Sequence, residues 1–207
     1  GRMLAPPPFL SSSPFIALFI GAVVAPFPAT MLTDAFGRRA AFALGASLGI
    51  AGGLVAAWGL VYGAFWPLTV GAFWIGIANG FALQYRHAAA AGPGSHRQLA
   101  IVVGAGAVIG LVAPTLAGFA ELRLSPFLGA GTALLAAAAH VVALAAALAL
   151  PVGSKPIRLE TAEISGRGSW LLPTGISAAA WFGMMGIMAF APLGLASLCS
   201  VHLVSAR

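Results

Sequence analysis

Long uncharged apolar runs dominate this chain and restrict the folds open to it. A bilayer core of about 30 Å needs roughly 20 helical residues to cross it, and backbone in hydrocarbon must satisfy its own hydrogen bonds. A barrel would instead show short strands of alternating polarity. We therefore expect an all-α, polytopic transmembrane helix bundle of about six spans. The expected spans cover residues 14–32, 40–61, 66–86 with an extension to 91, 99–120, 127–150 and 170–191.

Composition agrees with a membrane protein and excludes several other classes. Of 207 residues, 60% are apolar and 7% are charged, whereas a soluble domain carries roughly 25% charged residues. The net charge of +6 is not arranged as a basic stripe with interleaved aromatics, so we expect no nucleic-acid partner. The single cysteine, Cys199, excludes an internal disulfide. No metal-ligand spacing and no nucleophile–base set is present, so we expect no metal, no cofactor and no enzymatic activity.

The distribution of arginine and lysine predicts the orientation. The connectors after the first, third and fifth spans carry seven of these residues, and the connectors after the second and fourth carry only Arg123. The positive-inside rule places the first group in the cytoplasm and the amino terminus outside. The seven residues are Arg38, Arg39, Arg86, Arg97, Lys155, Arg158 and Arg167.

Small residues and prolines predict how the helices meet. Gly45, Gly49 and Gly53 repeat every four residues, which lays a flat stripe along one face of the second span and allows a neighbouring backbone to approach. Pro26 and Pro28 in the first span, and Pro114 in the fourth, remove backbone donors inside apolar runs, so we expect them to kink their helices.

A charged heptapeptide, "TDAFGRR" at residues 33–39, separates the first two spans. Asp34 and Arg38 are four apart, the spacing at which side chains on a helix become neighbours. Gly37 allows the chain to leave the helix, so the pair can also lie at a turn. From the residues alone, this stretch is either a functional loop or a charge cluster that only keeps the connector in the cytoplasm.

This stretch resembles the signature loop of the major facilitator superfamily. Between its second and third helices that family carries approximately G-x-x-x-D-R-x-G-R-R, and Asp34, Gly37, Arg38 and Arg39 occupy matching places. Thr30 stands at the first glycine and Ala35 at the first basic residue. Two later stretches support the resemblance: "GIANGFALQYRHAAA" is similar to the family's fourth helix, and "APTLAG" to the G-P-x-x-G-G pattern of its fifth.

The resemblance implies an incomplete transporter. Residues 1–151 would form an N-terminal half without its first helix, residues 152–169 the cytoplasmic central loop, and residues 170–207 one further helix and a short tail. The implied function is secondary transport of a small solute by alternating access, in a bacterial inner membrane. The motif loop would gate the pathway by binding a second transporter half. Two alternatives remain open: a non-transporting subunit of a larger respiratory or photosynthetic type of membrane complex, and a frameshift product.

The third and fifth spans supply the candidate polar contacts. Asn79 and Arg86 lie within about 20° of each other on one helical face, where they could contact an anionic or polar solute; Gln84, on another face, is a third candidate. Arg86 could equally extend to lipid headgroups. His140, midway along the fifth span, is either a proton relay or a neutral side chain bonded to a neighbouring helix. We expect Glu121, at an outer helix end, to be a solvated loop charge.

Overall fold

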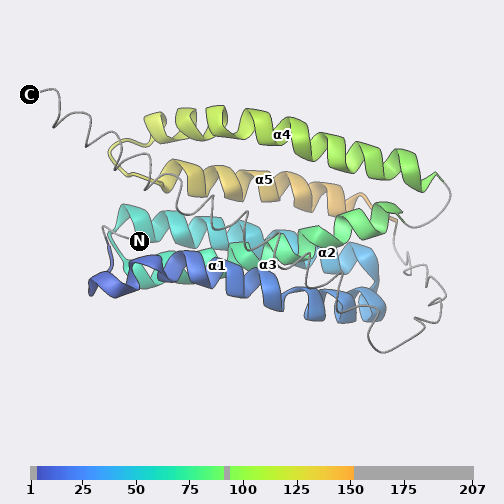
Figure 1. The fold of residues 1–207 in the computed structure, drawn as a ribbon, viewed down its shortest axis with the longest axis horizontal. Helices are drawn as coiled ribbons and strands as arrows, with labels where there is room; N and C mark the ends of the chain where they lie inside the picture. Colours follow the sequence, from blue (N-terminus) through green and yellow to red (C-terminus); the bar gives the residue numbers. More distant parts are fainter. Residues whose placement is uncertain (1–3, 91–93, 152–207) are drawn as a thin grey trace, which may run out of the picture. The chain divides into compact units, whose positions relative to one another are not determined.

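The computed structural model describes residues 4–90 and 94–151, and its ordered segments there are all helical (Figure 1). The 3-10 helix η1 (Pro8–Ser12) precedes α1 (Ser13–Val24), α2 (Pro26–Val61), α3 (Phe65–Ala90), α4 (Ser95–Arg123) and α5 (Ala130–Leu148). Within the described ranges, α2 to α5 are long and apolar enough to cross a membrane. The all-α transmembrane bundle is thus confirmed, while the expected central loop, sixth span and tail lie outside the described residues.

The first two expected spans meet at one glycine. Helix α2 contains Gly37 with φ 83° and ψ 167°, which is not a helical conformation. Before it, α1 and the start of α2 are separated at Ala25, next to Pro26, where a proline was expected to interrupt the helix. The connector between the two spans is therefore much shorter than expected: a single non-helical residue.

Close contacts at glycines show that the chain reverses at Gly37. Along α1, Leu18 lies at Gly76 and Ala25 lies at Gly80, so α1 and α3 run in parallel. Along the second part of α2, Gly45 meets Phe81, Gly52 meets Gly71 and Gly59 meets Leu68. That part of α2 therefore runs antiparallel to α3 and hence to α1. Gly49 and Gly53 meet His140 and Ala137 of α5, again in antiparallel order.

These contacts give the order of the helices. Helix α3 packs between α1 and the second part of α2, and α2 packs against α5 on another face. Among the described residues, the backbones of α3 and α5 do not approach each other closely, and α2 packs against both. Helix α4 contacts α3 and α5 but has no buried residue, and it continues as one helix through Pro114. The glycine stripe of α2 does face neighbouring helices, as its spacing predicted.

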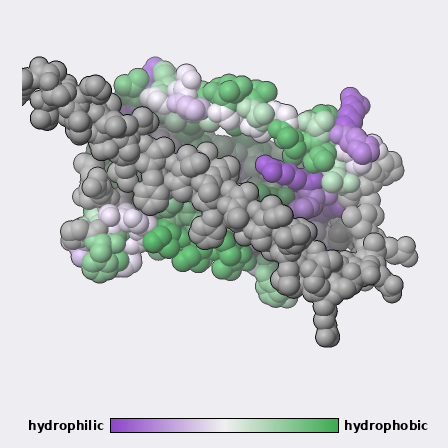
Figure 2. Space-filling view, viewed as in Figure 1, coloured by the Kyte–Doolittle hydropathy of each residue, from purple (hydrophilic) through white to green (hydrophobic). Residues whose placement is uncertain are grey.

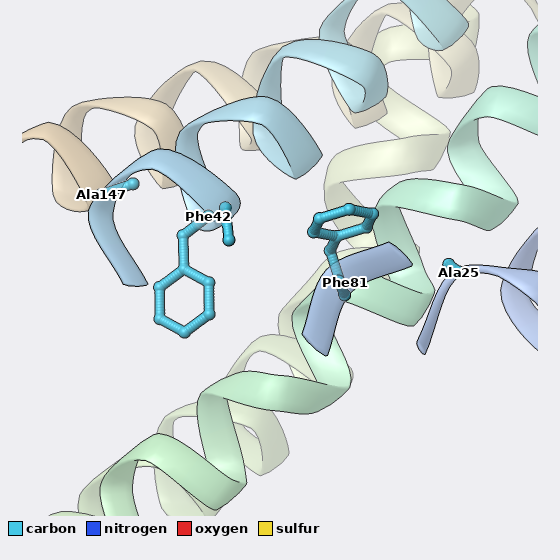
Figure 3. Close-up of a cluster of buried hydrophobic side chains, with 6 residues drawn as sticks. Ala25, Phe42, Phe81 and Ala147 are labelled. Atoms are coloured by element: carbon cyan, nitrogen blue, oxygen red, sulfur yellow. The ribbon is translucent and has the colours of Figure 1, made fainter. Parts of the chain in front are cut away.

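The core is built from small residues with a few aromatic rings. Apart from Pro14, the buried apolar side chains of the described residues are alanine or phenylalanine. The larger cluster joins Phe42 of α2 and Phe81 of α3, with Ala25 and Ala147 beside them (Figure 3). Phe81 is 2% exposed, and Tyr85 packs edge-on against Phe42 with ring centroids 4.6 Å apart. The small alanine side chains let helix backbones approach closely. The resulting van der Waals packing is one of the forces that hold helices together in lipid.

Candidate functional site

The turn at Gly37, within the charged stretch of residues 33–39, lies at the end of the bundle where α5 ends. Asp34 is exposed, and Arg38 and Arg39 are partly buried. Because the Gly37 conformation breaks the helix between them, Asp34 and Arg38 are not neighbours on one continuous helix, and the interpretation as a helical pair is wrong. The alternative, a pair of charges flanking a turn, agrees with the observed backbone.

Arg39 connects this turn to α5. Its Nη1 atom donates a hydrogen bond to the carbonyl oxygen of Leu150, 3.4 Å away. Leu150 follows the last turn of α5, where unpaired carbonyl groups and the helix dipole favour a cation. Arg39 thereby joins the turn to the end of α5.

The candidate polar side chains of α3 lie outside the buried core to different degrees. Asn79 and Arg86 are both exposed on this helix, and Gln84 is partly buried. Asn79 lies near the middle of α3, and it forms no side-chain hydrogen bond with the residues that the structure describes. An amide at this depth is costly against lipid tails, so it favours a polar or water-filled surrounding.

His140 occupies a gap in the α2–α5 interface. Its ring lies against Gly49, which has no side chain to fill that space. The Nδ1 atom is 2.8 Å from the carbonyl oxygen of Ala136, one turn earlier on the same helix. The expected bond to a neighbouring helix is therefore replaced by a bond within α5. The ring lies at the α2–α5 interface, whereas Asn79 is exposed on α3, a helix whose backbone does not approach α5 closely. The structure therefore does not bring these two candidate residues together.

Glu121 has a structural role that the sequence analysis missed. Its Oε2 atom accepts a hydrogen bond from the Gly129 amide at 2.7 Å, and its Oε1 atom accepts from the Thr132 amide at 2.6 Å and hydroxyl at 2.7 Å. These amides belong to the first turn of α5, whose N-cap residue, Gly129, has no side chain to do this. Glu121 is thus a cap supplied by α4, and the expected solvated loop charge is wrong. The sequence did carry a signal for this role, because Gly129, a residue without a capping side chain, stands immediately before an apolar run.

A cleft of about 410 Å³ lies beside this cap, at the opposite end of the bundle from Gly37. It is lined by Gly118, Glu121, Leu122, Ser125, Pro126, Phe127 and Leu128. Leu128 is 70% exposed. The cleft thus belongs to the α4–α5 connector, away from Asn79. No group of three His, Cys, Asp or Glu side chains with metal-binding geometry occurs in residues 4–90 and 94–151.

Comparison with known proteins gives one informative similarity. The chain is 31% identical over 119 residues to a riboflavin transporter, RfnT, of Brucella anthropi. The matched segment is 56% of this chain but only 30% of the relative's length. No family model matches the chain, and no solved structure matches it significantly. The apolar helices and this similarity fit an integral membrane protein of the transporter kind, and suggest that the chain is not an enzyme.

Proposed function

We propose that this chain forms part of a secondary transporter of the major facilitator type, which moves a small solute by alternating access. The observation that carries the proposal is the similarity to a riboflavin transporter. The Gly37 turn supports it, because the residues that resemble the superfamily's signature loop do form a sharp reversal between two antiparallel helices. In this proposal the bundle provides one wall of the pathway, and further membrane helices provide the other.

The gate would use the two sides of the Gly37 turn differently. Arg39 is bonded to the end of α5, so it fixes the turn to its own bundle. Asp34 is exposed, and with Arg38 it would bind the facing half when the pathway is closed on the cytoplasmic side. Asn79 would contact the solute, with Gln84 as a second polar group and His140 as a candidate proton relay. The motif turn would lie in the cytoplasm of a bacterial cell and the amino terminus outside.

Uptake of labelled riboflavin tests this function. Cells that lack their own riboflavin uptake and express the chain within its complete gene product should accumulate the vitamin saturably. Asn79→Ala should lower uptake about fivefold or more at equal membrane abundance, because a lost polar contact costs about 1 kcal/mol. Ser47→Ala is the matched control, since the Ser47 hydroxyl is already bonded to the Ala43 carbonyl of its own helix at 2.8 Å. Absence of flux for riboflavin and a solute panel under every imposed ion gradient would contradict transport.

A second candidate is an accessory subunit of a larger membrane complex. It is favoured by α4, which has no buried residue. At its glycines Gly104, Gly106, Gly110 and Gly118, no atom of the described residues lies within 4 Å of where a methyl group would be. Such a helix could pack against a partner. Co-purification of other membrane polypeptides at fixed stoichiometry, with no solute flux, would favour this candidate over transport.

A further inference from the structure

Four basic side chains gather where α3 ends and α4 begins. Arg86 and His87 lie near the end of α3, His96 and Arg97 lie in the first turn of α4, and all four are exposed. Hydrophilic surface gathers at this end of the two helices (Figure 2). Helix α3 contains no acidic residue, and the one acid of α4, Glu121, is at the other end, bonded to Gly129 and Thr132. Positive charge at this site is therefore not neutralised by either helix.

The lengths of the helices place these charges near the membrane surface. Helix α3 has 26 residues and α4 has 29, so they measure about 39 Å and 44 Å at 1.5 Å per residue. A hydrocarbon core is about 30 Å thick, and the excess length extends into the headgroup layer. Arg97 comes two residues before the apolar run that begins at Leu99. Its guanidinium group and that of Arg86 can therefore reach the level of lipid phosphates.

Beside this charged end, α4 offers an open apolar surface. Ile101 is 59% exposed and Val108 is 60% exposed. Gly104 lies on the same side of the helix as these two residues, and no atom of the described residues comes within 4 Å of a methyl group placed there, so the described residues leave the helix surface free at this point. An acyl chain would contact apolar side chains and shallow gaps along α4, next to the end that carries Arg86 and Arg97.

We propose that the α3–α4 end binds an anionic phospholipid, with its phosphate on Arg86 and Arg97 and an acyl chain along α4. Arginine presents a planar set of donors that matches phosphate oxygens. A zwitterionic headgroup would also bring an ammonium group, for which these two helix ends provide no carboxylate. From the sequence, Arg86 had two alternative contacts, a solute or lipid headgroups. This proposal assigns Arg86 to the lipid.

Lipid titration of the purified full chain in mild detergent tests the site, with native mass spectrometry as the readout. Phosphatidylglycerol should bind at least tenfold more tightly than phosphatidylcholine with the same acyl chains. Each arginine near a membrane surface contributes about fivefold in affinity, so Arg86→Gln with Arg97→Gln should weaken phosphatidylglycerol binding about 25-fold. Arg123→Gln is the matched control, because Arg123 lies at the far end of α4. There its Cζ atom is 4.7 Å from the centre of the Phe119 ring. This control should change binding less than twofold.

The alternative results overturn the proposal. An equal loss in Arg123→Gln would show general charge attraction. Displacement of the lipid by glycerol phosphate at the same concentration would show a site for a free anion, and a membrane polypeptide that covers α4 in place of lipid would show a protein interface. Arg86→Lys with Arg97→Lys keeps the positive charge but loses the planar donor set, so it should bind phosphatidylglycerol more weakly than the unsubstituted chain and more tightly than the glutamine pair. If it loses as much as the glutamine pair while its circular dichroism stays helical, attraction of the phosphate to the positive charge is wrong.

Discussion

Gly37 is the residue on which the antiparallel arrangement of α1 and α2 depends. Its φ of 83° with ψ of 167° lies in a region that is almost restricted to glycine, and a side chain there costs about 1–3 kcal/mol. Gly37→Ala should therefore lower the free energy of unfolding by that amount, measured by thermal denaturation in detergent with circular dichroism. Gly104→Ala, at a helical position where the described part of the chain leaves room for a methyl group, is the control and should be neutral or slightly stabilising. Equal stability of both variants would mean that the reversal does not need glycine.

Glu121 should behave as a helix cap and not as a surface charge. Loss of a capping side chain typically costs about 1 kcal/mol, so Glu121→Ala should destabilise the chain by roughly that much. Thr132→Val removes the hydroxyl that donates to Oε1 and should cost less. Because the two residues share one interaction, their double variant should be less destabilised than the sum of the single variants. If denaturation shows that the stability loss of the double variant equals the sum of the two single losses, the hydrogen bond between Glu121 and Thr132 is contradicted.

Helix pairing in this bundle depends on contacts between glycines. A methyl group built on Gly52 of α2 would lie 2.8 Å from the Gly71 carbonyl oxygen of α3, which is too close for any carbon atom. Gly52→Ala should force the two helices apart and destabilise the bundle by about 1–3 kcal/mol. Gly106→Ala makes the same chemical change on α4, where no atom in residues 4–90 and 94–151 lies within 4 Å of the added methyl group. Thermal denaturation should separate these variants clearly, and an equal effect would show that α2 and α3 are not this close.

The elements were more predictable than the contacts between them. Apolar runs located α3, α4 and α5 because a helix of bilayer length needs a long uncharged segment, and polar ends such as Ser95–Arg97 then extended α4 beyond the expected span. The Glu121 cap and the bond from Arg39 to Leu150 join residues 8 to 111 positions apart. No local pattern specifies such partners, because they follow from which helices pack side by side.

At the scale of the whole molecule, side-chain contacts show which helix ends lie together at each end of the bundle. Arg39 is bonded beyond the last turn of α5, and Tyr85, one residue before Arg86, packs on Phe42. The Gly37 turn, the end of α3 and the end of α5 therefore share one end. Glu121 and the first turn of α5 form the other. Of the seven basic residues that the sequence assigned to one side of the membrane, Arg38, Arg39 and Arg86 lie at the Gly37 end, whereas Lys155, Arg158 and Arg167 lie outside the described residues.

Cysteine labelling tests this division in the membrane. In a chain carrying Cys199→Ala, Ala35→Cys marks the Gly37 end and Ser125→Cys marks the α4–α5 connector; both positions are exposed. If the basic end is cytoplasmic, a membrane-impermeant maleimide should label Ser125→Cys in intact cells and should label Ala35→Cys only after permeabilisation. The reverse pattern would overturn the orientation but keep the bundle. Labelling of both positions from the same side would contradict the bundle itself, because α5 would then not connect the two surfaces.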